Sequence, residues 1–456
     1  MNTFLKNPFI LFGCLIFGIL LNAGCKKNDD SDATPDILVQ NETAAVPVAW
    51  MKMYLEIDRY MLDFHPGPTS RSLAYINLAA YESVMSGMPE FNSVENLFSD
   101  LTIPDAGNDE YHFPTVVNAV YANLFKRLLP GEYIDAAQQS NLQFDILALE
   151  DEFNASFRNI ISTNVYNRSQ EYGEAVANAV WEWSKSDPFG HEAYTNSRPQ
   201  GYTPPTGPGL WQPTAPDFAA SLFPYWGNVR TFAISETEKL AGEPLTFNED
   251  LMSQFYVQAL EVRNTVNNLE FNDQWQAEFW SDDQPGLTFS PVARWVSIAI
   301  QIIEQDECHL ETALYALVKL SIVLNDVGVA CWHSKYTYSV ERPITYINRV
   351  FDADWEPYQT ATPSFPGYPS SHASFSAAAA EVLSHVFGYE YAFTDASHDN
   401  RDDFLGMPRS FDTFYQMAEE NAVSRIKAGV NFRMDVEEGL QLGYAVGRKV
   451  NSMPFK

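Results

Sequence analysis

The chain has 456 residues, of which 46% are hydrophobic and 19% are charged, and it carries a formal net charge of -31 at pH 7. This composition is sufficient for a sizeable core and excludes global disorder. The negative charge, without any basic stripe, also excludes a nucleic-acid-binding role. At this length the chain holds one large domain or two to three ordinary ones. An anion site in so acidic a protein has to be built locally, from Lys, Arg and helix N-termini.

The first predicted element is a secretion signal. An apolar run from Pro8 to Leu21 follows Lys6, and it is too short to be a typical membrane span. Small residues then precede Cys25, and a polar, acidic stretch follows it. This arrangement resembles a bacterial lipoprotein signal, although Asn22 stands where such signals usually have Leu.

The lipoprotein resemblance implies that residues 1–24 are removed, that Cys25 is lipidated, and that residues 25–45 form a flexible acidic tether. We therefore expect a membrane-anchored bacterial protein, periplasmic or facing the cell surface, and held at the outer membrane. An uncleaved N-terminal anchor is the alternative, and it also places the folded part outside the cytoplasm.

Residues 46–456 have the pattern of a single large helical domain. Apolar residues at three- and four-residue steps predict a helix from Val46 to Phe64, and a second helix opens at Pro68 and continues through Met85. Alternating strand patterns are nearly absent, and no repeat of fixed period is found. The predicted fold class is therefore all-α. Further helices are expected at 114–129, 138–160, 168–185, 249–268, 290–305 and 309–331.

Residues 201–232 cannot form one continuous helix, because they contain six prolines. They are also rich in large rings, which a disordered linker rarely carries. We expect a long, ordered loop packed over the helical core. Its rings either seal the core or line the mouth of a site. These rings include Trp211, Tyr225, Trp226 and Phe232.

Cysteines and acidic clusters predict little chemistry. Cys308 and Cys331 would form a disulfide if they were close enough, and two core thiols are an equally good interpretation. No cysteine spacing suggests a zinc site. The acidic stretch 395–403 lacks the frame of a calcium-binding EF-hand loop, and we interpret it as a solvated loop.

Two cations follow a strongly apolar segment of the chain. Lys335 and Arg342 are seven residues apart, which predicts that both lie on one face of a helix, two turns apart. Because residues 317–332 are strongly apolar, this helix is expected to be mostly buried. A buried cation needs a partner, and a bound oxyanion would supply one. The same spacing is also common on solvated helix faces.

A second block, Pro369-Ser370-Ser371-His372, predicts a helix N-terminus. Prolines precede it and a strong helix-forming sequence follows it. The free N–H groups and the dipole of this helix favour an anion. Ser370 would donate its hydroxyl proton to that anion, and His372 would transfer protons. The alternative is that Ser370 or Ser371 only caps the helix and that His372 is a surface residue.

A third block runs from Ser424 to Asn431. Arg425 lies late in an amphipathic helix that begins near residue 412, and Asn431 follows the expected end of that helix. Asp435 can cap the next helix. No histidine follows His398, so no neighbouring imidazole can replace Asn431.

In order and spacing, these blocks resemble the pattern K-x6-R-P, P-S-G-H and S-R-x5-H of vanadium-dependent haloperoxidases and type-2 phosphatidic acid phosphatases. The resemblance implies helical bundles around an anion site whose motifs fall within residues 326–435, and it implies that His372 is the acid–base group. Two positions depart from the pattern. Ser371 replaces a glycine, and Asn431 replaces the histidine that binds vanadate directly or attacks phosphate. The resemblance also implies that the oxygens of vanadate or phosphate are held by Lys335, Arg342, Ser370, Ser371 and Arg425.

Three functions remain open. A haloperoxidase relative would use vanadate as a Lewis acid, with hydrogen peroxide and a halide as substrates. Asn431 would weaken this activity, because a neutral amide oxygen replaces an imidazole. Alternatively, a non-catalytic surface lipoprotein would bind phosphate, vanadate or a partner in the same pocket. Phosphomonoester hydrolysis is the third possibility, and it suffers most because an amide cannot act as the nucleophile.

Overall fold

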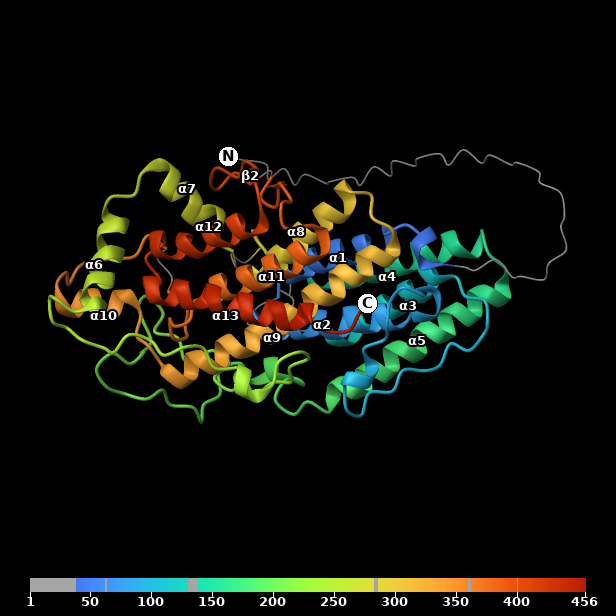
Figure 1. Cartoon of the computed structure of the whole chain (residues 1–456), viewed down its shortest axis with the longest axis horizontal. Helices are drawn as coiled ribbons and strands as arrows, with labels where there is room; N and C mark the ends of the chain where they lie inside the picture. The colour runs from blue at the N-terminus through green and yellow to red at the C-terminus, as the bar shows by residue number, and fades with distance from the viewer. Residues whose placement is uncertain (1–37, 62–63, 130–137, 283–285, 360–361, 400) are drawn as a thin grey trace, which may run out of the picture. The chain divides into compact units, whose positions relative to one another are not determined.

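The computed structural model describes residues 38–61, 64–129, 138–282, 286–359, 362–399 and 401–456 (Figure 1). The predicted signal peptide, the lipidation site Cys25 and most of the predicted tether lie outside these residues. The last part of the tether is described, and it does not behave as predicted. Val39 is fully buried in the core, and Thr43 forms a β-bridge with His309, so the ordered chain begins before residue 46.

The described residues are mostly helical, which confirms the predicted all-α class. Their only β-structure, apart from isolated bridges, is the short antiparallel pair β1 (Phe393–Asp395) and β2 (Arg409–Phe411). Short 3-10 helices lie at η1 (Val39–Asn41), η2 (Met85–Gly87), η3 (Glu95–Leu97), η5 (Ala193–Asn196), η6 (Trp226–Asn228) and η7 (Glu236–Glu238). The α-helices are α1 (Ala45–Asp58), α2 (Gly67–Glu82), α3 (Phe113–Leu128), α4 (Gln139–Arg158), α5 (Thr163–Lys185), α6 (Gln254–Asn267), α7 (Phe271–Phe279), α8 (Pro291–Gln305), α9 (Leu310–Tyr338), α10 (Pro343–Val350), α11 (Ser371–Phe387), α12 (Phe414–Lys427) and α13 (Arg433–Asn451).

Helix α9 lies at the centre of the packing because its sequence is apolar on every side. It contacts α2 and α8 as well as α11 and α13, so it joins helices from the beginning, the middle and the end of the chain (Figure 1). Among the described residues, α9 is the one helix long and apolar enough to cross a membrane. Its most apolar window is entirely buried within the fold, as expected of a core helix.

Helices α11 and α13 run side by side and approach unusually closely (Figure 1). Gly439, Gly443 and Gly447 recur every four residues and therefore share one face of α13. A Cβ atom at Gly443 would lie 2.4 Å from the carbonyl oxygen of Ser374 on α11, and one at Gly439 would lie 2.7 Å from that of Ser370. The absence of side chains on this face thus lets the two backbones touch.

The proline-rich segment 201–232 is ordered, as predicted. The rings of Trp211 and Trp226 are almost fully buried, and the backbone N–H of Trp211 donates to the carbonyl oxygen of Ser339 at 2.7 Å. Tyr225 keeps about half of its surface exposed. These contacts support the interpretation that the rings seal the core.

The two described cysteines form no disulfide with each other, and one residue of the acidic stretch forms a buried ion pair. Cys331 is a buried free thiol and Cys308 is a half-buried one, so the core-thiol interpretation holds. The acidic stretch 395–403 is not simply a solvated loop, as we interpreted it, because Asp395 is fully buried and pairs with Arg294 at 3.2 Å. Within the described ranges, no group of three or more His, Cys, Asp or Glu side chains is placed to hold a metal ion.

Gly443→Ala is expected to lower the free energy of unfolding by about 1–3 kcal/mol, because the added Cβ would overlap the Ser374 carbonyl and force α11 and α13 apart. The higher helix propensity of alanine, about 1 kcal/mol, offsets part of this cost. Urea unfolding followed by circular dichroism measures the change. Gly201→Ala is the matched control, since a Cβ there meets nothing within 4 Å, and we expect a change of at most about 0.5 kcal/mol. Equal stability of the two variants would contradict the close approach.

Candidate anion site

Five of the seven candidate residues line one cavity of about 550 Å³. They come from three separate parts of the chain, as the motif pattern predicted, and they are Arg342, Ser371, His372, Arg425 and Asn431. The other two, Lys335 and Ser370, are buried and do not line the cavity.

Lys335 and Arg342 do not share a helix face, so that prediction is wrong. Helix α9 ends at Tyr338, and Ser339 adopts a left-handed conformation with φ of 50°. Arg342 is then the N-cap residue of α10. The break was not apparent from the sequence because Ser339 occupies a conformation that usually favours glycine.

The ammonium group of Lys335 is held entirely by backbone oxygens. Its Nζ donates to the carbonyl oxygens of Pro366, Gly367 and Pro369 at 2.9, 3.1 and 2.6 Å. Burial lowers the pKa of Lys335 to about 8. The side chain therefore fixes the segment that leads into α11 and contributes positive charge behind the cavity wall, rather than a direct hydrogen bond to a ligand.

Arg342 and Arg425 each retain one guanidinium nitrogen without a hydrogen-bond partner in the protein. Arg342 donates from Nε to Phe365 O at 3.0 Å and from Nη1 to Val430 O at 2.9 Å, but its buried Nη2 has no partner in the protein. Arg425 donates from Nη1 to Trp280 O at 2.8 Å and from Nη2 to Gln359 Oε1 at 2.6 Å, and its buried Nε has no partner. Burial lowers the pKa of both arginines to about 10, so both remain charged at neutral pH. Two fixed guanidinium groups thus have donors left for a ligand at the cavity.

The N-terminus of α11 also faces this cavity. The hydroxyl of Ser370 accepts from the backbone N–H of Ala373, so Ser370 caps the helix, as the alternative interpretation held. Ser371 and His372 follow in the first turn and line the cavity. The Nε2 atom of His372 is buried and has no hydrogen-bond partner. Burial, followed by the charges of Arg425 and other nearby cations, lowers the pKa of His372 well below its usual value.

Asn431 occupies the cavity wall where the family pattern has its last histidine. Its amide nitrogen donates to Gly367 O and to Asp435 Oδ2, both at 3.0 Å. Both amide hydrogens are therefore used, and the amide oxygen is the atom left to contact a ligand. That oxygen is an acceptor, so it offers an oxyanion no hydrogen bond.

Two buried carboxyl groups, those of Asp435 and Asp282, place negative charge near the buried cations. The motifs did not predict this role for either residue. Asp435, predicted only as a helix cap, also accepts from the N–H of Phe432 at 2.9 Å and lies near Arg342 and Lys335. Asp282 lines the cavity, where its Oδ1 accepts from Arg294 Nη1 at 3.4 Å, its Oδ2 has no partner, and Arg425 lies nearby. Burial raises the pKa of both carboxyl groups to about 6. An acidic residue in the first turn of α13 was a usable signal for Asp435, whereas no local pattern marks Asp282.

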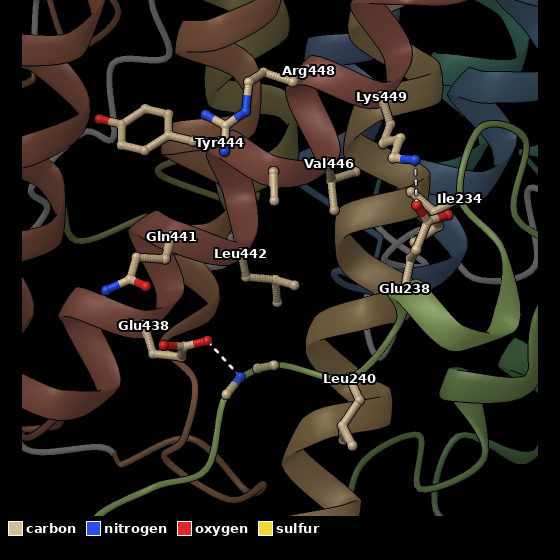
Figure 2. Close-up of a pocket in the computed structure, with 13 residues that line it drawn as sticks. Ile234, Glu238, Leu240, Glu438, Gln441, Leu442, Tyr444, Val446, Arg448 and Lys449 are labelled. Carbon is tan, nitrogen blue, oxygen red and sulfur yellow. Dashed lines mark hydrogen bonds and ion pairs between the residues drawn. The ribbon is translucent and has the colours of Figure 1, made fainter.

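The other hollow of comparable size, about 480 Å³, contains none of the seven candidate residues. It lies between α13 and the segment that follows η7, where Glu438 accepts from the backbone N–H of Gly242, and Lys449 pairs with Glu238 (Figure 2). Arg448 extends along its rim (Figure 2). Its mixed charges give no concentration of donors like that around Arg342.

Comparisons with known proteins identify relatives of this chain. The family model described as the VCPO second helical-bundle domain matches residues 315–454, which include all the candidate residues. The vanadium chloroperoxidase of Curvularia inaequalis is 24% identical over 464 residues, covering 81% of this chain and 74% of that protein. The solved structure of a bacterial vanadium-dependent iodoperoxidase matches this chain with a TM-score of 0.77 and 28% identity. The match covers 91% of this chain and 97% of the iodoperoxidase chain.

A holo-type bacterial vanadium-dependent chloroperoxidase shares the fold, with a TM-score of 0.64 at 15% identity, covering 85% of this chain and 93% of its own. These matches support the vanadium haloperoxidase superfamily that the motifs predicted. The predicted helical-bundle architecture is confirmed as well.

His372→Gln is expected to reduce the loss of stability on acidification. An unfolded histidine has a pKa of about 6.5, so below that pH the unfolded state binds a proton that the folded state does not. His372 therefore lowers the free energy of unfolding as the pH falls through about 6.5. Urea unfolding at about pH 7.5 and pH 5.5 measures the effect. The contributions of Asp282 and Asp435 occur in both proteins, so an identical pH dependence in the two would show that His372 titrates normally.

Proposed function

We propose that this protein binds a tetrahedral oxyanion, vanadate or phosphate, in the cavity at the N-terminus of α11. With vanadate, we propose hydrogen-peroxide-dependent halide oxidation at a rate limited by Asn431. The observation that carries the proposal is the set of three buried nitrogen atoms without partners, on Arg342, Arg425 and His372. Buried donors without partners are costly, and an oxyanion would satisfy them with charge-assisted hydrogen bonds.

The donor set fits an oxyanion in charge and in hydrogen bonding. Arg342 Nη2 and Arg425 Nε would hold its oxygens, and the first backbone N–H groups of α11 would add to them. Lys335 contributes charge from behind the wall. Neutral His372 would donate or accept one proton at Nε2, depending on its tautomer. When bound, vanadate supplies a Lewis acid that activates hydrogen peroxide toward a halide.

A direct bond to vanadium is the part of the site that does not fit. Asn431 offers only its amide oxygen, because Gly367 and Asp435 occupy its nitrogen. This observation favours a second candidate function, non-catalytic binding of phosphate or vanadate. Phosphate ester hydrolysis is less favoured, since an amide cannot serve as the nucleophile. We also propose that the protein is secreted and held at a membrane through Cys25.

Arg342→Gln is expected to weaken binding of orthophosphate by about tenfold or more, because a hydrogen bond to a charged group contributes about 1.5–3 kcal/mol. Isothermal titration calorimetry with orthophosphate, and separately with orthovanadate, measures the affinity. Arg448→Gln is the matched control, because Arg448 lies on the other hollow and should leave binding unchanged (Figure 2). Equal affinities of the Arg342 variant and the natural protein would place the oxyanion elsewhere.

Asn431→His is expected to raise vanadate-dependent oxidation of bromide and iodide by at least about tenfold. One ring N–H would find the acceptors that Asn431 now uses, Gly367 O and Asp435 Oδ2, which would orient the other ring nitrogen for vanadium. Peroxide-dependent halide oxidation is assayed with and without added vanadate. Asn108→His provides the control, since it adds an exposed imidazole far from the motifs.

The halide-oxidation assay has three informative outcomes. Vanadate-dependent turnover by the natural protein supports the peroxidase proposal. Turnover by only the Asn431→His variant identifies a binding protein on a haloperoxidase fold. No turnover by either, with intact vanadate binding, would contradict the view that Asn431 limits activity.

A further inference from the structure

The cavity is larger than an oxyanion requires. Its volume of about 550 Å³ falls in the range of roughly 300–1,000 Å³ typical of sites for organic ligands. Arg342, Arg425 and His372, which carry the three partnerless nitrogens, belong to its lining. Much of the remaining lining is apolar, from Met61, Pro66, Leu222, Pro291, Phe365 and Phe375. A tetrahedral oxyanion alone would leave this apolar surface in contact with water.

A second group of polar side chains lies where this cavity meets a smaller one. The smaller cavity, of about 120 Å³, is formed largely by residues 214–219 of the proline-rich loop. Arg198, Thr362 and Ser364 line both cavities. Arg198 donates from Nη1 to Ser364 Oγ at 2.8 Å, and the buried hydroxyl of Thr362 has no hydrogen-bond partner. The junction therefore combines a fixed guanidinium group with an unsatisfied hydroxyl.

The charges around the cavity favour an anion at this junction as well. The two cavities together are lined by four arginines and two aspartates, Asp282 and Asp217, a formal balance of +2 in a chain whose net charge is -31. Arg342 and Arg425 face the oxyanion, whereas Arg198 and Arg59 do not belong to any of the three motifs. Such local positive charge raises the concentration of anionic ligands inside a cleft.

The two cationic groups are connected by successive residues. Ser364 Oγ accepts from Arg198, and the carbonyl oxygen of Phe365 accepts from Arg342 at 3.0 Å. The two guanidinium groups therefore bind adjacent residues of the same cavity wall. The ring of Phe365 lies on this wall, and Leu222 from the proline-rich loop also lines the cavity.

We propose that the cavity takes a small organic anion as a second ligand, with its acidic group at Arg198 and Thr362 and its apolar body against Phe365 and Leu222. This inference rests on the proposed function in one respect: the organic anion would be the substrate that shares the cavity with the bound oxyanion. The subsite itself consists of residues outside the three motifs. Its occupant is an aromatic or short aliphatic carboxylate rather than a neutral molecule.

The test compares two ligands that differ in charge and hardly in shape. Binding of 4-hydroxybenzoate and of neutral 4-hydroxybenzamide to the full chain is measured by calorimetry, with saturating orthophosphate present to fill the oxyanion site. We expect the carboxylate to bind at least about tenfold more tightly than the amide. Equal affinities for the two ligands would overturn the inference without requiring any variant.

Two variants test which residues cause the preference for the carboxylate over the amide. Arg198→Gln should abolish this preference, while the affinity for orthophosphate stays within about twofold of that of the natural protein. Thr362→Val removes only the unsatisfied hydroxyl, keeps the side-chain volume, and should weaken binding of the carboxylate by at least about threefold. Arg448→Gln is the control for net charge and should change neither affinity.

The remaining outcomes separate this inference from the proposed function. A preference that survives Arg198→Gln, or that is lost equally in Arg448→Gln, would overturn the subsite. Loss of orthophosphate binding in Arg198→Gln would also overturn it, because Arg198 would then belong to the oxyanion site. If the natural protein fails to bind orthophosphate but keeps an Arg198-dependent preference for the carboxylate, the oxyanion proposal fails and the organic-anion subsite stands.

Discussion

Three glycines on one face of α13 allow its backbone to lie directly against that of α11, whose first residues line the cavity. The backbone N–H of Ser370 donates to the carbonyl oxygen of Asp435 at 2.8 Å, which joins the start of α11 to the first turn of α13. Because both helix starts are fixed together, His372 and Asn431 face the same space. A side chain between the two helices would separate these residues and open the site. The dense core beneath α11 and α13 is therefore a condition for the geometry above it.

Charge compensation is the second constraint on the site. The cations are buried in a protein whose net charge is strongly negative, and buried cations need partners. Lys335 is satisfied by carbonyl oxygens, while Asp435 and Asp282 lie near Arg342 and Arg425, respectively. The cavity thus remains positive without any cation left wholly uncompensated. Such a balance suits a ligand that enters and leaves, because the empty site keeps its structure.

Helix periodicity was sufficient to predict the fold class. Segments such as α9 are apolar over many turns, and few segments show the alternation of apolar and polar residues that indicates a strand. The motifs were sufficient to place five side chains in one cavity. Two features were not accessible to this reasoning. The end of α9 at Tyr338 depends on a left-handed Ser339 that no local rule marks, so Arg342 was assigned to the wrong helix. Contacts such as that of Arg425 with Trp280 join residues 145 positions apart, and sequence patterns do not report such pairs.

The hydrogen bonds of Asn431 have a consequence for the history of this site. Gly367 and Asp435 hold the amide nitrogen with two acceptors, and the same acceptors would orient an imidazole. Asparagine and histidine codons differ by a single base, so one point mutation separates this chain from one with the histidine of its relatives' motif. A single base change thus separates a cavity wall that presents an amide oxygen from one that presents an imidazole beside acceptors already in place.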